Sequence, residues 1–229
     1  MKKLGLIGGL SWRSTARYYQ IINERVGREQ GGLHSAPLIL ESLDFADWGR
    51  SFSEEEWDEV KDPILSSAQR LETAGVDGLV ICANSIHALY DDVKEAVAIP
   101  VLHIADAVGE KMKKDRVTSA ALVGTRNVMA EKFYRQRLVA AGISLLPADM
   151  ELAGQIDRIV YEELAFGKAM RVSERFMKSE ITDIAKQNVQ ALVLACTELE
   201  MIVDTRANVL PIYDSMSIHA NAAADFILS

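Results

Sequence analysis

The chain has 229 residues, of which 49% are hydrophobic and 25% are charged, and its formal net charge at pH 7 is −8. This composition is typical of a globular protein with a packed core, long enough for one large domain or two small ones. The acidic balance and the lack of a basic run argue against a nucleic acid partner. Because no apolar run reaches membrane-spanning length, we expect no membrane association and a cytoplasmic location.

Short β-rich runs alternate along the chain with longer amphipathic stretches. The predicted strands cover residues 4–7, 37–43, 78–82, 101–104, 120–124, 145–146, 191–195 and 210–213. The predicted helices cover residues 14–29, 54–74, 86–96, 129–141, 151–166, 173–187 and 217–228. Strands that alternate with helices predict parallel sheets covered by helices on both faces.

Three segments of the first half recur in the second half in the same order. Residues 6–9 (LIGG) match 122–125 (LVGT), 79–85 (LVICANS) match 192–198 (LVLACTE), and 99–101 (IPV) match 210–212 (LPI). We infer an internal duplication. It predicts an α/β fold of two pseudo-symmetric lobes, each a parallel sheet flanked by helices, with the active site in the cleft between them. The first lobe is expected over residues 1–108 and 212–229, and the second over 109–211.

Four predicted strands end in small or polar residues, and ligands of parallel sheets bind beyond the carboxyl ends of the strands. Free backbone N–H groups at the start of a following helix can also hold an anion there. The sequence therefore predicts a site for a small ligand that carries a carboxylate. The candidate binding residues are Gly9, Asn84, Ser85, Thr125, Thr197 and Glu198. The alternative for Gly9 is that it only forms a tight turn and does not bind a ligand.

The two cysteines of the chain stand near the ends of matching strands, but in different registers. Cys196 lies just before a helix start, where a helix dipole would stabilise a thiolate; the alternative is a small buried apolar residue. The counterpart of Cys196 is Ala83, and alternation along a strand turns Cys82 to the other face unless a bulge rotates it inward. Two cysteines are too few for a disulfide framework, and no metal-ligand spacing occurs, so we expect no metal.

Two histidines stand near these strand ends: His87 after Asn84 and Ser85, and His103 after a predicted strand. By position we rank them above His34 and His219 as functional candidates. The alternative for each is a structural hydrogen-bonding role.

With these motifs the chain resembles the PLP-independent aspartate/glutamate racemases of the Asp/Glu/hydantoin racemase superfamily. The resemblance covers essentially the whole length and is carried by residues 5–15 (GLIGGLSWRST), 31–36, 102–106, 122–126 and 195–198 (ACTE). It implies two α/β lobes, homodimers, a small amino-acid substrate and no cofactor, and it adds Leu10 to the binding residues. It also implies two opposed acid/base groups, usually thiols, of which one removes the α-proton and the other returns a proton to the opposite face; Cys196 and Cys82 are the candidates.

The chain departs from the resembled motif at one important position. Ala83 stands where the family has a cysteine or a threonine, and alanine carries no transferable proton. Three interpretations stay open. A local shift could let Cys82 serve in an ordinary racemase. Cys196 could work alone, as in one-cysteine decarboxylases of similar sequence, or the site could bind a small amino acid without turnover.

Overall fold

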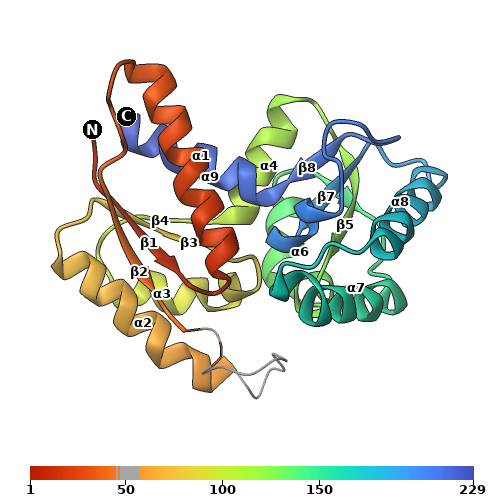
Figure 1. The fold of residues 1–229 in the computed structure, drawn as a ribbon, viewed down its shortest axis with the longest axis horizontal. Helices are drawn as coiled ribbons and strands as arrows, with labels where there is room; N and C mark the ends of the chain where they lie inside the picture. Colours follow the sequence, from red (N-terminus) through yellow and green to blue (C-terminus); the bar gives the residue numbers. More distant parts are fainter. Residues whose placement is uncertain (45, 47–56) are drawn as a thin grey trace. The chain divides into compact units, whose positions relative to one another are not determined.

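The computed structural model describes residues 1–44, 46 and 57–229, and the chain divides into two compact units. The first unit comprises residues 1–104 and 219–229, and the second comprises residues 105–218. Each unit contains a four-stranded parallel sheet flanked by helices (Figure 1). The predicted α/β architecture with two sheets is therefore confirmed.

The first unit is built on the strands β1 (Leu4–Gly8), β2 (Leu38–Ser42), β3 (Gly78–Ile81) and β4 (Val101–Leu102), in the order β2-β1-β3-β4. Its helices include α1 (Trp12–Gln30), α2 (Trp57–Thr73), the 3-10 helix η2 (Ser85–Leu89) and α3 (Tyr90–Ala96). Figure 1 shows α2 and α3 on one face of the sheet and α1 on the other. Every residue of β1 and β3 is buried, because helices cover both faces, and this is why these strands read as unbroken apolar runs. The first residues of the predicted helix 54–74 lie outside the described residues.

The second unit repeats this arrangement with β5 (Ser119–Gly124), β6 (Ser144–Leu145), β7 (Ala191–Ala195) and β8 (Ile212–Asp214), in the order β6-β5-β7-β8. Its helices include α5 (Arg126–Ala130), α6 (Lys132–Ala140), α7 (Met150–Glu162), α8 (Arg171–Ala185) and the 3-10 helices η3 (Leu164–Phe166) and η4 (Thr197–Met201). In both sheets the first strand of the unit pairs with the second and the third, which supports the inferred duplication.

The units differ from the expected lobes mainly at β8. The expected second lobe ends at residue 211, but β8 pairs in parallel with β7, and Leu192 N donates a hydrogen bond of 3.0 Å to Pro211 O. These backbone bonds place β8 in the second sheet, so the second unit extends to residue 218.

Two helices begin or end near the points where the chain passes between the units. Helix α4 (Ile104–Lys114) starts at the last residue of the first segment, and α9 (Ser215–Leu228) contains the second passage at 218/219. Helix α4 was not predicted, although its buried Ile104, Val108 and Met112 follow one another at intervals of four residues. The Asp214 carboxylate caps α9 by accepting hydrogen bonds from the N–H groups of Met216 and Ser217.

Three predicted helices are interrupted in the structure. The predicted helix 86–96 consists of η2 and α3, and 129–141 falls into α5 and α6 because Glu131 is extended, with φ −77° and ψ 156°. The predicted helix 151–166 ends in α7 at Glu162 and continues only as η3. The spacing of apolar residues alone does not distinguish one continuous helix from two shorter helices that follow each other after a brief interruption.

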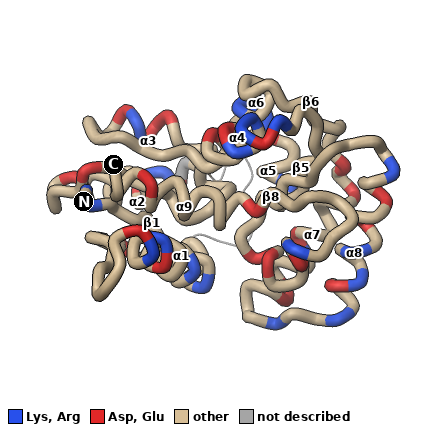
Figure 2. The backbone as a smooth tube through the Cα atoms, turned by 90° about the horizontal axis from the view of Figure 1, so that it is seen from above, with Lys and Arg blue, Asp and Glu red and all other residues tan. Residues whose placement is uncertain are grey.

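The helix surfaces carry both signs of charge (Figure 2). Arg25 pairs with Glu29 within α1 at 3.3 Å, and Lys111 pairs with Asp115 at the end of α4. Exposed pairs of this kind stabilise a helix by only about 0.3–0.5 kcal/mol each. Within the described ranges, no helix is long and apolar enough to cross a membrane.

Candidate active site

Cys196 lies directly after β7, at the carboxyl end of the second sheet, and only 5% of it is exposed. Its Sγ donates a hydrogen bond to Glu198 Oε2 over 3.3 Å. Thr197 Oγ1 donates to the same carboxylate oxygen over 2.7 Å. One half-buried carboxylate therefore accepts hydrogen bonds from both the thiol and the hydroxyl that follow the strand.

The surroundings of Cys196 favour the neutral thiol. Burial raises the pKa of Cys196 well above its ordinary value, and the negative charge of Glu198 raises it further. The backbone N–H groups of Glu198 and Leu199 act in the opposite direction, as donors to the sulfur at the start of η4. The sequence led us to expect a thiolate stabilised by the helix start. Those N–H groups are present, but burial and the carboxylate outweigh them.

Helices α5 and α7 contribute further polar groups to the carboxyl end of the second sheet. The side chain of Asp157 on α7 accepts a hydrogen bond of 2.9 Å from Arg126 N, at the start of α5, and its Oδ2 lies 3.6 Å from Arg126 Nε. Thr125, half-buried, precedes α5. Tyr161, also on α7, has its pKa raised by burial and by the nearby Cys196, Asp157 and Glu198. The thiol thus shares its surroundings with two carboxylates and a phenol.

In the first unit, the turn after β1 has a conformation that requires glycine. Gly9 has φ +79°, and a Cβ on it would lie 2.0 Å from Leu43 O. Its N–H donates to Thr15 Oγ1 over 2.9 Å, and this bond ties the turn to α1. Leu10, which follows, is 5% exposed and packs in the core between the sheet and α2. The glycine turn is confirmed as a close approach of two backbone segments, whereas the predicted ligand role of Gly9 and Leu10 stays a prediction.

The turn after β3 carries Asn84 and Ser85 at the same edge of the first sheet. Asn84 is 5% exposed, and Ser85 is half-buried at the start of η2. His87 Nδ1 lies 2.7 Å from Ala83 O and holds the turn from within. Both polar residues therefore stand beyond the strand end, where the sequence placed them.

Cys82 has different surroundings from Cys196. It is fully buried, its N–H donates to Ile7 O over 2.9 Å as a continuation of the sheet, and burial alone raises the pKa of its thiol well above the ordinary range. The next residue, Ala83, packs against the cluster that contains Leu79 and Ile81. Since successive strand residues point to opposite faces, Cys82 points away from that cluster.

The same alternation identifies the counterpart of Ala83 in the second unit. Cys196 belongs to the cluster that contains Leu192 and Leu194, as Ala83 belongs with Leu79 and Ile81. Cys196 and Ala83 are therefore equivalent by face as well as by sequence register. No bulge that would rotate Cys82 inward interrupts β3, which pairs with β1 residue for residue from Gly78 to Ile81.

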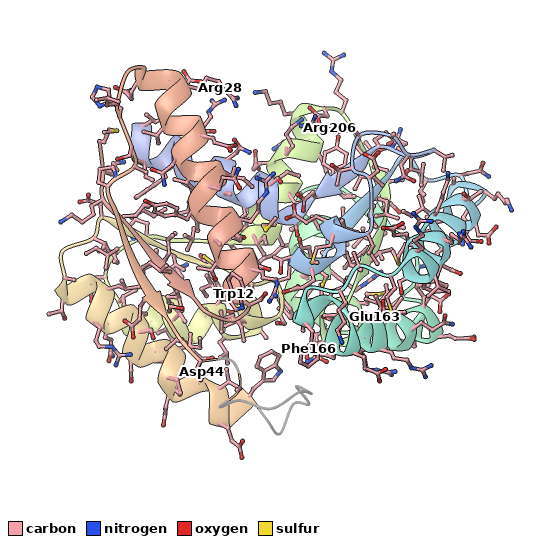
Figure 3. The ribbon with its side chains drawn as sticks, viewed as in Figure 1. Trp12, Arg28, Asp44, Glu163, Phe166 and Arg206 are labelled. Atoms are coloured by element: carbon pink, nitrogen blue, oxygen red, sulfur yellow. The ribbon has the colours of Figure 1, made fainter. Side chains whose placement is uncertain are left out.

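Three cations are candidates to bind a substrate side-chain carboxylate, and each has a neighbour of its own. Arg13 lies over the ring of Trp12, with its guanidinium carbon 4.4 Å from the ring centroid, and Trp12 is exposed at the start of α1 (Figure 3). Lys168 Nζ lies 5.9 Å from the ring centroid of Phe166. Arg126 pairs with Asp157 as described above. Among the described residues, no group of three His, Cys, Asp or Glu side chains has the geometry to hold a metal ion.

Sequence analysis did not identify Asp157, Tyr161 or Thr15 as part of these strand-end regions. Asp157 and Tyr161 are spaced four residues apart on α7 and so share one helix face, but nothing in the sequence says that Tyr161 lies near Cys196. Thr15 was a recognisable candidate, because it closes the run that begins with the two glycines.

The family of the chain is shown by a match to a family model. Residues 7–223 match the model of the Asp/Glu/hydantoin racemases. The chain belongs to this family. The family resemblance seen in the sequence is thereby confirmed, and the coarse function, that of a racemase, follows from it.

Individual relatives agree with the family assignment. A broad-specificity amino-acid racemase of Bacillus subtilis (strain 168) is 23% identical over 174 residues, which are 75% of this chain and 74% of the relative. The crystal structure of a proposed Asp/Glu racemase from Yersinia pestis superposes with a TM-score of 0.91 at 38% identity, covering 100% of both chains. An aspartate racemase homologue from Pyrococcus horikoshii OT3 superposes with a TM-score of 0.83 at 29% identity, also covering 100% of both chains.

Proposed function

We propose that this family member is an amino-acid racemase that acts on aspartate, glutamate or a related small amino acid, with Cys196 as its proton-transfer group. The observation that carries the proposal is the hydrogen-bonded set of Cys196, Thr197 and Glu198 at the end of β7. A thiol beside a carboxylate in a buried setting is a suitable general acid and base, since its proton has a nearby acceptor.

The proposed reaction begins with loss of the thiol proton of Cys196 to water, which leaves a thiolate beside the Glu198 carboxylate. The thiolate then removes the α-proton: the Cα–H bond breaks, an S–H bond forms, and the electron pair stays on the substrate as a carbanion delocalised into its carboxylate. Backbone and side-chain donors at the strand ends would stabilise that charge. The Cys196 thiol, after exchanging its proton with solvent, then returns a proton to Cα: the S–H bond breaks, a Cα–H bond forms and the thiolate is regenerated. Inversion requires that a second proton donor, which is not Cys196, delivers the proton to the opposite face instead.

The substrate class rests on the relatives. The Bacillus subtilis relative is named for amino acids in general, and the Pyrococcus horikoshii relative for aspartate. An acidic substrate needs a cation for its second carboxylate. Arg126, at the start of α5, is one candidate, although it already pairs with Asp157.

A second candidate function is favoured by the position of Ala83. Ala83 is the counterpart of Cys196 and has no proton to give, while Cys82 points to the other face of the strand and is fully buried. An enzyme with Cys196 as its single base would exchange or deliver a proton on one face only. In that case, α-proton exchange or decarboxylation would proceed without inversion.

The experiment that tests both candidates is α-proton exchange in D₂O, followed by NMR with L- and D-aspartate, L- and D-glutamate and then the other amino acids, each enantiomer separately. Exchange from both enantiomers of one amino acid, with inversion, supports the racemase. Exchange from one enantiomer without inversion supports the one-base enzyme. Absence of exchange from every amino acid would overturn the proposed function.

A further inference from the structure

Three of the four histidines of the chain lie together in the interior of the first unit. His87, His103 and His219 are 1%, 3% and 0% exposed. The ring centroid of His87 lies 4.6 Å from that of His103 and 5.5 Å from that of His219. His34, the fourth, is exposed. Burial of three imidazoles in one cluster is costly unless each is neutral and hydrogen-bonded.

The hydrogen bonds of His87 fix its protonation state. Its Nδ1 lies 2.7 Å from Ala83 O, and a carbonyl can only accept, so Nδ1 carries the hydrogen. Its Nε2 accepts a hydrogen bond of 3.2 Å from Ile104 N, so Nε2 is bare. A second proton on the ring would place two donors face to face at Ile104. His87 is therefore neutral, as the Nδ1–H tautomer.

His219 is neutral in the other tautomer. Its Nε2 donates to Leu102 O over 3.2 Å, and its Nδ1 accepts from the buried Tyr18 hydroxyl over 2.9 Å. Burial holds the pKa of His219 well below its ordinary value, and proximity to His87 lowers it further. The titratable groups in ring contact with the cluster include Tyr18 from α1 and Tyr90 from α3, whose ring centroid is 4.7 Å from that of His103.

The two bonds of His87 join functionally different segments. Ala83 precedes Asn84 and Ser85 in the turn after β3, and Ile104 is the last residue before the chain passes into the second unit. His219 is the first residue after the chain returns. The imidazole of His87 thus spans between the turn that carries two candidate substrate ligands and the segment where the chain leaves the first unit.

We propose that His87 is a positioning residue: as a neutral imidazole it fixes the Ala83–Asn84–Ser85 turn against Ile104, and protonation of the ring breaks the hydrogen bond to Ile104 N. The role in substrate binding rests on the proposed function, whereas the bridge itself does not. Protonation disrupts only the hydrogen bond to Ile104 N. The hydrogen bond to Ala83 O uses the Nδ1–H, which both the neutral and the protonated ring have.

Two substitutions separate the two bonds of His87. In His87→Asn, the amide nitrogen can take the place of Nδ1 and keep the bond to Ala83 O, while the bond to Ile104 N is lost. In His87→Gln, the amide oxygen can take the place of Nε2 and keep the bond to Ile104 N, while the bond to Ala83 O is lost. His34→Gln is the matched control, because it removes the exposed histidine.

The first measurement uses the unmodified protein: the ring ¹⁵N and ¹H signals of the four histidines are followed by NMR between pH 8 and 5. We expect His87 as the Nδ1–H tautomer and His219 as the Nε2–H tautomer over the upper part of this range. The Nε2–H tautomer of His87, or a charged His87 ring at pH 8, would overturn the proposal even before any variant is made.

The second measurement is amide hydrogen exchange in the variants. Loss of one hydrogen bond is expected to speed local exchange about tenfold. His87→Asn should speed exchange at Ile104 and spare residues 84–87, and His87→Gln should do the reverse. Only His87→Gln should raise KM for the substrate. Equal effects of both variants on amide exchange in both segments would contradict a bridging role. Failure of all amino-acid turnover would overturn the proposed function but would leave the expected amide-exchange pattern unchanged.

Discussion

Cys196 and Ala83 occupy the same position in the two halves of the chain. Each follows a buried strand, and each packs with the residues two and four positions before it: Leu194 and Leu192 for Cys196, Ile81 and Leu79 for Ala83. One half therefore has a thiol at this position, hydrogen-bonded to Glu198, and the other has a methyl group. The second cysteine of the chain is one residue away from the equivalent position, on the opposite face of its strand.

Replacement of Ala83 by cysteine should restore the second thiol. Ala83 is only partly buried, so a sulfur is expected to fit without repacking of the core. A correctly placed general acid contributes about 10²–10⁴-fold to a proton transfer, so inversion should rise by at least about 10²-fold relative to proton exchange. The ratio of inversion to exchange in D₂O checks this. An unchanged ratio would mean that another group already serves the second face.

Glu198→Gln should lower the pKa of the Cys196 thiol. The substitution removes the negative charge beside the sulfur but leaves an amide that can still accept from Thr197. A nearby charge shifts a pKa by about 1–3 units, so thiolate should form about one pH unit lower or more. Thiolate absorbance or the alkylation rate against pH, measured in a Cys82→Ala background, reports this. Glu200→Gln, which removes a charge further along η4, is the control, and an equal shift in both would assign the effect to net charge.

The raised pKa of Cys196 also predicts a pH dependence for the unmodified enzyme. Only the thiolate can remove the α-proton, and the pKa lies well above 9.0. The rate of exchange at low substrate concentration should therefore increase about tenfold per pH unit up to that pKa. Glu198→Gln should move the whole profile to lower pH. A rate that is flat between pH 7 and 9 would contradict a resting thiol.

The prediction from sequence was accurate where burial determines the pattern. Strands β1, β3 and β7 are buried throughout, and β5 is buried except at Ser119; their apolar runs identified them, with β7 found at its true bounds. Helix α4 was missed because its first residue, Ile104, was interpreted as the end of the predicted strand 101–104. The split of a predicted helix at Glu131 depends on one extended residue, which periodicity does not reveal.

For the candidate site, register and alternation predicted that Cys82 and Cys196 would differ, because both follow from local geometry. The contact of Cys196 with Glu198 was not predictable, since it depends on the tight turn of η4. The histidine cluster was not predicted: the sequence only ranked His87 and His103 as single candidates by their place near strand ends, and His219 comes from the last helix. Only the topology of the first unit brings residues 87 and 219 together.

Gly9→Ala should destabilise the first unit and disturb its strand-end turn. The new Cβ would lie 2.0 Å from Leu43 O, and φ +79° is unfavourable for alanine. We expect a loss of about 2 kcal/mol or more in the free energy of unfolding, measured with urea. Gly75→Ala is the matched control, because Gly75 has φ +76° but nothing within 4 Å of its Cβ position. It should cost about 1 kcal/mol, and equal losses would show that only the backbone angle matters.

The buried His219 predicts a loss of stability in acid. Its pKa in the folded protein lies well below 6.5, whereas the unfolded chain takes up a proton near pH 6.5. The contribution of His219 to the free energy of unfolding should therefore be constant above this pH and fall by up to about 1.4 kcal/mol per pH unit below it. His219→Gln should remove this share of the slope in urea titrations between pH 7.5 and 4.5. A wild-type slope in His219→Gln would contradict the assignment.

The most direct test of the central claim compares Cys196→Ala with Cys82→Ala in the D₂O exchange assay, on the amino acid that the unmodified protein turns over, after circular dichroism has shown that both variants are folded. If Cys196 is the proton-transfer group, Cys196→Ala should lose at least about 10²-fold in exchange rate. Cys82→Ala should stay within about twofold of the unmodified protein, because Cys82 would then act only as a buried apolar residue. Full exchange in Cys196→Ala, or its loss in Cys82→Ala, would contradict the account.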